Sequence, residues 1–215
     1  MERTGIVITT YNRPHYLKKC LDSLKSSFIF EDTIIVIVDD CSINQNTIDL
    51  INAFKIEGVE IFKILGTDNK GVWKRLQEGF DFLIEQECKV LCNIDSDAIV
   101  NNHWQLKLEQ CYSVNKDKII SGFNAMNSAR FDKGVEFENY FEKEIVCGLN
   151  LYFNKSLYKY VIESFNSCEL WDIHLPTIIK KAKKKFIVTK PSVMQHIGFE
   201  SSMNHTATPR ALDFI

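Results

Sequence analysis

The first hundred residues alternate between short apolar runs and longer amphipathic stretches. A continuous apolar run rich in β-branched residues is typical of a strand buried on both faces, whereas apolar residues every three or four positions indicate a helix with one buried face. We predict strands over residues 5–9, 33–38, 59–65 and 90–94. The intervening helices are predicted over residues 17–24, 48–54 and 72–83. This alternation indicates an α/β domain with a mostly parallel central sheet flanked by helices.

The pattern is less regular in the second half of the chain. Further strands are predicted over residues 119–123, 145–153 and 186–189, and helices over residues 104–111, 157–165 and 171–185. Residues 124–144 are polar and aperiodic, which predicts a long loop of the kind that often binds a ligand. Residues 201–215 are also polar and are predicted to form a flexible C-terminal tail. Since neither a repeat nor a linker interrupts the sequence, we expect a single domain over residues 1–215.

Composition and charge limit the kinds of protein that this chain can be. The chain has 215 residues, 45% of them hydrophobic, which is enough for one sizeable core. A formal net charge of −2 gives no general attraction for nucleic acid or an anionic membrane. The seven cysteines are an odd number without Cys-x-x-Cys spacing, and the N-terminus does not resemble a signal peptide. No apolar stretch approaches the roughly 18 residues of a transmembrane segment. We therefore expect a reducing, cytoplasmic setting.

Polar residues follow each of the first four predicted strands. In an open α/β sheet these strand ends meet at one edge, where ligands bind. Tyr11 offers a ring on which a nucleotide base can stack, and Asp40 can accept a hydrogen bond from a base or a ribose hydroxyl. Arg75 could reach a phosphate, for which the planar guanidinium is well suited. The sequence therefore predicts a nucleotide site at this edge.

Asp95-Ser96-Asp97 follows the fourth predicted strand and supplies two carboxylates. Such a triplet also occurs in ordinary strand-to-loop turns. However, the chain contains neither Gly-x-Gly-x-x-Gly nor Gly-x-x-x-x-Gly-Lys, so glycine-rich loops of those types cannot hold a diphosphate. Its charge would then be met by side chains and by a divalent cation, which prefers oxygen ligands. We expect Asp97, assisted by Asp95, to hold that cation.

Four segments together resemble the ordered motifs of family 2-like glycosyltransferases of the GT-A fold. They are Thr9-Thr10-Tyr11-Asn12-Arg13, Val38-Asp39-Asp40-Cys41-Ser42, Asn69-Lys70-Gly71 with Arg75, and Asp95-Ser96-Asp97. The resemblance implies a GT-A (Rossmann-like) single domain, with residues 1–100 as the nucleotide-binding half and residues 101–200 as the acceptor-binding and catalytic half. It departs at Cys41, where the family usually has glycine.

The same resemblance implies roles for individual residues. Asp97 would ligate Mn²⁺ or Mg²⁺ bridging the two phosphates of a nucleotide-sugar donor. The residues expected around that donor are Thr9, Tyr11, Arg13, Asp40, Asn69, Gly71, Arg75, Asp95 and Ser96.

Two segments of the second half carry a looser resemblance. Glu169-Leu170-Trp171-Asp172 resembles the acidic motif that supplies the catalytic base of inverting members. Asp172 is the expected base, although Glu169 remains an alternative and Asp172 could instead cap a helix. Trp73, Trp104 and Trp171 either pack in the core or provide a platform on which an acceptor sugar stacks, and Trp171 is the best candidate for that platform. His196 resembles the histidine that completes the metal shell in related enzymes, although a histidine in such a turn is by default structural.

The expected function is therefore a metal-dependent glycosyltransferase of hexosyltransferase type that uses a nucleotide sugar, with UDP-sugar favoured. Asp172 would deprotonate the acceptor hydroxyl in an inverting transfer. The sequence leaves the acceptor open: a glycan or lipid-linked sugar is favoured over nucleic acid or protein. A nucleotidyltransferase is one alternative, but it would normally carry a glycine-rich basic loop after the first strand. A binding protein that keeps the GT-A fold without catalysis is the other.

Overall fold

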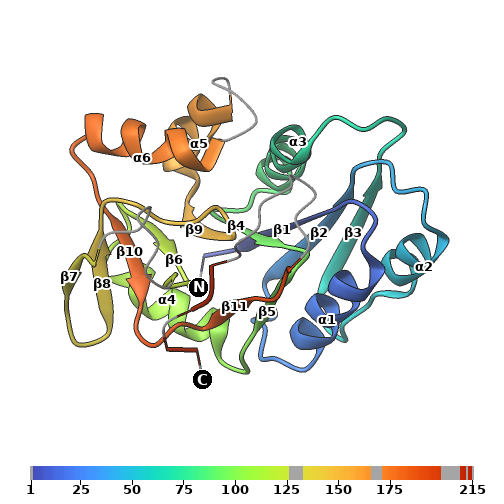
Figure 1. The fold of residues 1–215 in the computed structure, drawn as a ribbon, viewed down its shortest axis with the longest axis horizontal. Helices are drawn as coiled ribbons and strands as arrows, with labels where there is room; N and C mark the ends of the chain where they lie inside the picture. Colours follow the sequence, from blue (N-terminus) through green and yellow to red (C-terminus); the bar gives the residue numbers. More distant parts are fainter. Residues whose placement is uncertain (1, 126–132, 166–170, 200–208, 212, 215) are drawn as a thin grey trace.

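A nine-stranded sheet runs through the centre of the computed structural model (Figure 1), which describes residues 2–125, 133–165, 171–199, 209–211 and 213–214. The strand order is β3-β2-β1-β4-β9-β6-β10-β8-β7. Of these strands, β8 and β9 run opposite to the other seven. The strands are β1 (Thr4–Thr10), β2 (Thr33–Asp39), β3 (Glu60–Leu65), β4 (Val90–Asp95), β6 (Ile119–Ser121), β7 (Val135–Glu136), β8 (Tyr140–Lys143), β9 (Asn150–Asn154) and β10 (Phe186–Thr189). The predicted α/β fold with a mostly parallel sheet is confirmed.

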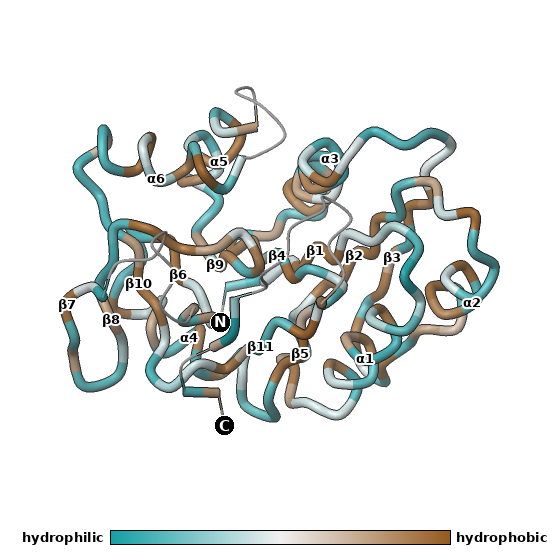
Figure 2. The backbone as a smooth tube through the Cα atoms, viewed as in Figure 1, coloured by the Kyte–Doolittle hydropathy of each residue, from teal (hydrophilic) through white to brown (hydrophobic). Residues whose placement is uncertain are grey.

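Helices cover both faces of this sheet. On one face lie α1 (Pro14–Lys25), α2 (Gln45–Ala53) and α4 (Trp104–Ser113), and on the other lie α3 (Val72–Glu85), α5 (Tyr158–Phe165) and α6 (Trp171–Lys181). A short 3₁₀ helix, η1 (Lys155–Leu157), precedes α5. Successive side chains of a strand point to opposite faces, so Ile6 and Ile8 pack on the α1 side and Val7 on the α3 side. Figure 2 shows the apolar strands between these two layers.

The structure differs from the sequence prediction mainly in the second half. Within residues 124–144, predicted as a loop, β7 and β8 form a hairpin that pairs with β10; residues 126–132 lie outside the described part. The hairpin strands are short and carry charged residues, so their sequence lacks a strand period. Strand β9 begins only at Asn150, and α6 ends at Lys181 rather than Lys185.

A separate two-stranded antiparallel sheet consists of β5 (Ala98–Val100) and β11 (Met194–His196). Strands of three residues carry no usable hydrophobic period, so neither was predicted. Their pairing places His196 opposite Ala98, and Ala98 directly follows Asp97 in the sequence. A histidine and a carboxylate far apart in the sequence are thereby brought together.

Part of the predicted C-terminal tail contacts the body of the protein. Ala211 forms a β-bridge with Ala125, and its N–H donates to Gln195 Oε1 over 2.9 Å. Asp213 Oδ1 accepts from the N–H and the hydroxyl of Ser192 at 3.0 and 2.6 Å. These contacts hold residues 211 and 213 close to β11.

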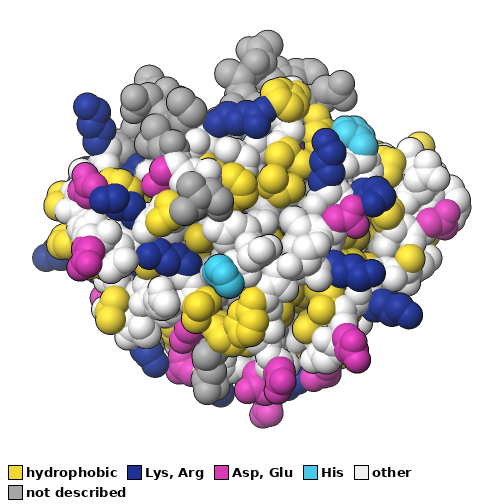
Figure 3. Space-filling view, turned by 90° about the horizontal axis from the view of Figure 1, so that it is seen from below, with side chains coloured by type: hydrophobic (Ala, Val, Ile, Leu, Met, Phe, Trp, Pro, Cys, Tyr) yellow, Lys and Arg dark blue, Asp and Glu magenta, His cyan; other side chains and the backbone are white. Residues whose placement is uncertain are grey.

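The described surface carries mixed charge. Figure 3 shows one face on which basic and acidic side chains are interspersed among small groups of hydrophobic ones. Within the described ranges, no helix has the length and apolar character needed to cross a bilayer.

Candidate active site

The loops that follow β1, β2 and β4 meet at one edge of the sheet. The parallel register aligns Thr9 with Asp95 and Thr10 with Asp39. Side chains at the carboxyl ends of these strands therefore meet at one edge, where an open α/β sheet binds its ligands, and we call this edge the crevice.

Asp40 is held in a fixed position by the loop before α3. Its carboxylate accepts from the N–H groups of Lys70 and Gly71 at 2.7 and 3.0 Å. Arg75 Nε donates to the same carboxylate over 2.9 Å, with both side chains buried (3% and 8% exposed). The segment Asn69-Lys70-Gly71 thus contributes through its backbone, and Gly71 adopts a positive φ of 87° there.

The guanidinium of Arg75 does not face the crevice as a phosphate ligand. Besides Asp40, it donates to Glu78 Oε2 over 2.6 Å and to the carbonyl of Asp68. Gly66 packs against it so closely that a β-carbon there would collide with the guanidinium. In this geometry Arg75 orients Asp40, which differs from the phosphate contact that the sequence predicted. The sequence could not show this, because Asp40 and Arg75 are 35 residues apart.

The loop after β1 is tied to the loop after β2. Asn12 and Arg13 have positive φ values of 52° and 51°. Asn12 Oδ1 accepts from the N–H groups of Ile43 and Asn44, both at 3.1 Å, and its own N–H donates to Ser42 Oγ over 2.6 Å. Cys41, at φ 65°, also lies in the left-handed region. That conformation costs a non-glycine residue energy, whereas the glycine expected here from the resemblance would adopt it freely.

Of the remaining residues predicted on the nucleotide side, Tyr11 is 41% exposed, so its ring is accessible to a base. Thr9 and Ser96 are buried beside the strand ends, and Asn69 Nδ2 donates to the carbonyl of Asp40 at 3.4 Å. The sequence-predicted residues of this half therefore line or support one crevice.

Asp97 lies between a cation and a histidine. Arg13 Nη1 donates to Asp97 Oδ2 over 3.0 Å, and His196 Nε2 lies 3.4 Å from Oδ1. The N–H of Ile197 also donates to the Asp97 carbonyl over 2.8 Å. A β-carbon on Gly198 would lie 2.6 Å from Asp97 Oδ2, so only glycine leaves this carboxylate unobstructed. Asp97 and His196 are thus brought together as predicted from the resemblance.

The two carboxylates of the triplet have opposite pKa shifts. Burial raises the pKa of Asp95 well above its ordinary value, and the charges of Asp97 and then Asp172 raise it further. Burial would also raise the pKa of Asp97, but His196 and Arg13 outweigh it and lower that pKa. Burial and the neighbouring carboxylates therefore disfavour the charged form of Asp95, and a bound cation would favour it.

Replacement of Asp95 by Asn is expected to stabilise the protein in the absence of metal. An acid with a raised folded-state pKa loses stability as pH rises from its unfolded pKa, about 3.9, through the folded value. The Asn variant has no carboxyl group to ionise and does not lose this stability. The difference in stability between the variant and the wild type should therefore grow with pH. We expect about 1 kcal/mol, or a gain of 2–4 °C in Tm, at pH 8 and less at pH 5. Thermal melts of both proteins measure this, with the exposed Asp49→Asn as control. An advantage that shrank with rising pH would contradict the burial argument.

Asp172 approaches the crevice from the second half of the chain. It lies in the first turn of α6, where a β-carbon on Gly148 would be 2.9 Å from its Cβ. The Gly148 carbonyl accepts from the buried Asn93 side chain at 2.8 Å, and the Leu149 carbonyl accepts from the N–H of Asp95 at 3.1 Å. Residues 148–149 therefore contact both Asp172 and the end of β4, where Asn93 and Asp95 lie. Neither Gly148 nor Asn93 was identified from the sequence, because each acts through a contact more than twenty residues away.

Trp171 is not available as a sugar platform. The side chain is 5% exposed, its ring centroid lies 5.4 Å from that of Phe165 in an edge arrangement, and it packs against Gly148. Of the two alternatives that the sequence left open for Trp171, the structure therefore supports packing in the core, where the side chain anchors α6. Glu169, the alternative base, lies outside the described residues.

The donor set suits a divalent cation. A carboxylate and an imidazole nitrogen converge on one point, and His196 Nδ1 is buried with no hydrogen-bond partner among the described residues. Those same residues contain no group of three or more His, Cys, Asp or Glu able to hold a metal by themselves. Asp97 and His196 would therefore need further oxygen ligands from a diphosphate and water.

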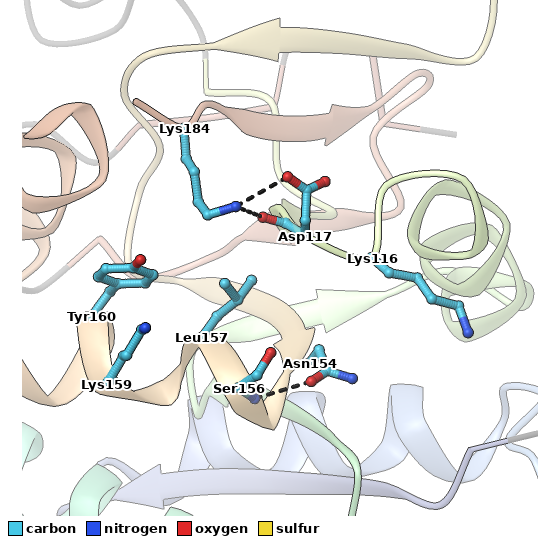
Figure 4. Close-up of a pocket in the computed structure, with 8 residues that line it drawn as sticks. All are labelled: Lys116, Asp117, Asn154, Ser156, Leu157, Lys159, Tyr160 and Lys184. Atoms are coloured by element: carbon cyan, nitrogen blue, oxygen red, sulfur yellow. Dashed lines mark hydrogen bonds and ion pairs between the residues drawn. The ribbon is translucent and has the colours of Figure 1, made fainter. Parts of the chain in front are cut away.

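A pocket of about 380 Å³ lies at the opposite end of the sheet (Figure 4). It is formed by residues before β6, at the end of β9, in η1 and α5, and before β10, and its carboxylate, Asp117, pairs with Lys184 at 3.0 Å. Lys184, which belongs to the lysine-rich run over residues 180–185, is therefore paired with an acidic side chain. The pocket is separate from the crevice that contains Asp40, Asp97 and Asp172.

The family to which the chain belongs follows from a comparison with known protein families. Residues 5–163, more than half of the chain, match the family described as Glycosyl transferase family 2. The chain belongs to glycosyl transferase family 2. The region matched includes the four motifs of the nucleotide side but ends before Asp172 and His196. A search of curated proteins finds no match to this family 2 chain.

Among solved structures, the family 2 chain is similar to S. aureus TarS residues 1–349, with a TM-score of 0.62 and 17% sequence identity. The alignment covers 86% of this chain and 57% of the TarS chain. At this identity the likeness shows a shared fold. The chain thus spans little more than half the length of this neighbour.

Proposed function

We propose that this protein is a metal-dependent glycosyltransferase that transfers a sugar, of hexosyl type, from a nucleotide donor to an acceptor hydroxyl with inversion. UDP-sugar is the favoured donor. The observation that carries the proposal is that the strand ends preceding Asp40 and Asp97 are aligned, that His196 faces Asp97, and that the charge of Asp172 acts on Asp95, all in a family 2 chain.

Donor binding divides between the two loops on the nucleotide side. Tyr11 stacks on the base, and the rigidly held Asp40 orients the nucleoside through its carboxylate edge. Because Arg75 and two backbone N–H groups already fix Asp40, little side-chain entropy is lost when the nucleotide binds. Asp95 and Ser96 lie next to the ribose and diphosphate.

Transfer then requires one group that takes the proton of the acceptor hydroxyl and another that balances the charge on the leaving diphosphate. The carboxylate of Asp172 takes the proton of the acceptor hydroxyl as its oxygen attacks the anomeric carbon, opposite the leaving diphosphate. The bond between that carbon and the phosphate oxygen breaks, and the electron pair leaves with the diphosphate. Mn²⁺ or Mg²⁺ held by Asp97 and His196 would stabilise the charge that develops there.

A thermal-shift experiment tests the donor assignment without knowledge of the acceptor. A ligand that binds only the folded state stabilises it, by about 2.7 kcal/mol at a hundredfold excess over Kd. UDP with Mn²⁺ should therefore raise Tm of the protein by about 5–10 °C. Asp97→Ala should abolish the Mn²⁺-dependent part of this rise, and Asp49→Asn should keep it.

Slow hydrolysis of UDP-sugars in the presence of Mn²⁺ provides the second measurement. A panel of UDP-sugars and other nucleotide sugars would show which donor is used. Absence of any shift with UDP and Mn²⁺ would rule out the UDP donor, whereas a shift without hydrolysis of any sugar nucleotide would favour a binding protein.

A further inference from the structure

The ion pair between Arg13 and Asp97 places a cation on the carboxylate proposed to hold the metal. Arg13 Nη1 lies 3.0 Å from Asp97 Oδ2, with the two side chains 28% and 10% exposed. The other oxygen of Asp97 faces His196. In the donor-free protein, a guanidinium therefore balances the charge of this carboxylate.

The backbone holds Arg13 at this position against a conformational cost. Asn12 and Arg13 are consecutive non-glycine residues in the left-handed region, which is strained above all for a long side chain such as that of Arg13. The loop after β2 enforces this conformation through its three hydrogen bonds to Asn12. The Arg13 carbonyl is fixed as well, because it accepts from Tyr16 and Leu17 at the start of α1. Movement of the guanidinium is thus confined to side-chain rotation.

A divalent cation on Asp97 would conflict with this arrangement. It would lie beside the guanidinium, so like charges would repel and Arg13 would have to release the carboxylate. A cation without nucleotide offers the displaced guanidinium no anion in exchange. A diphosphate offers oxygens to which the planar guanidinium binds strongly, often through two hydrogen bonds.

We propose that Arg13 exchanges Asp97 for the donor diphosphate, and that this exchange makes binding of the metal and binding of the nucleotide depend on each other. The inference rests on the proposed function and specifies how its site is loaded. Metal alone binds weakly, because Arg13 competes for Asp97. Metal with nucleotide binds tightly, because Arg13 gains a phosphate. Such coupling is reciprocal, so each ligand raises the affinity for the other by the same factor.

The coupling is measured through the Kd of Mn²⁺, from the electron paramagnetic resonance signal of unbound Mn²⁺, with and without saturating UDP. In the wild type, UDP should tighten Mn²⁺ binding by tenfold or more, within the usual range of about 5–150-fold. Arg13→Met keeps an apolar stem and removes the charge. It should bind Mn²⁺ alone about tenfold more tightly and UDP in the presence of Mn²⁺ about tenfold more weakly.

Two further variants control for general effects of charge and for the chemistry of the cation. Lys18→Met removes an exposed cation on the same helix, paired with Asp22, and should leave both constants unchanged. Arg13→Lys keeps the charge but not the planar fork, so it should restore weak binding of Mn²⁺ alone with only part of the coupling. Circular dichroism would verify that each variant is folded.

Three outcomes would overturn the inference. Unchanged coupling in Arg13→Met would show that Arg13 is a bystander. Equal weakening of Mn²⁺ with and without UDP would show that Arg13 merely shapes the site. If the wild type bound neither Mn²⁺ nor UDP, the proposed function would fail together with the inference, whereas the first two outcomes leave that function intact.

Discussion

Asp172→Asn is expected to reduce the kcat of sugar transfer by about 10³-fold. A positioned general base contributes typically 10²–10⁴-fold, and the amide cannot accept the proton of the acceptor hydroxyl. The substitution preserves size, and Gly148 leaves room for either side chain, so α6 should keep its position. The loss should therefore fall on kcat, with the thermal shift given by UDP and Mn²⁺ unchanged. Steady-state transfer to an acceptor and the thermal shift together measure this separation.

Two comparisons make the result specific to Asp172. Asp49→Asn makes the same chemical change at an exposed position of α2 and should retain full transfer. Glu169→Gln tests the alternative base from the same acidic segment. Full activity of Asp172→Asn together with a large loss in Glu169→Gln would transfer the role to Glu169.

Arg75→Met is expected to destabilise the protein by about 3 kcal/mol. Removing one partner of a buried ion pair leaves a buried charge uncompensated, which costs about 3–5 kcal/mol. We expect the lower value, because Lys70 and Gly71 continue to donate to Asp40. For a chain of this length the Tm should fall by roughly 10 °C. Since Asp40 then loses its orientation, affinity for UDP should fall as well.

Denaturant unfolding of four proteins tests this prediction. Arg3→Met removes an arginine whose pair with Glu60 is exposed, and should cost no more than about 1 kcal/mol. Asp40→Asn combined with Arg75→Met should recover part of the loss, because the unpaired charge is gone. A cost for Arg75→Met equal to that of Arg3→Met would show that the buried pair does not stabilise the fold.

The three aspartates of the nucleotide side could be predicted because they lie at or just after the ends of buried strands. The apolar runs that become β1, β2 and β4 are long enough to identify, and parallel strands must end at the same edge. Asp40, Asp95 and Asp97 follow from those two facts. The family motifs then assigned them to a nucleotide sugar, and the family itself is confirmed.

The side chains that hydrogen-bond to or pack against the site residues could not be predicted, because these contacts join segments that are distant in the sequence. Arg75 reads as a phosphate ligand in the sequence, yet Asp40, Glu78 and the Asp68 carbonyl surround it in the structure. The sequence left Trp171 either in the core or as a sugar platform beside the expected base, and only the contacts with Gly148 and Phe165 place it in the core. In both cases burial, which the local sequence does not encode, decides the role.

The position of β9 has a consequence for the order in which the chain acquires its parts. This strand inserts antiparallel between β4 and β6, and its pairs with β4 join residues about sixty positions apart. During synthesis from the N-terminus, Asp95 and Asp97 therefore emerge before the strand that covers the edge of β4, and before Asp172 and His196. Pairings this distant form slowly, because a long loop must close first. A nascent chain would thus present its nucleotide side well before the proposed base joins it.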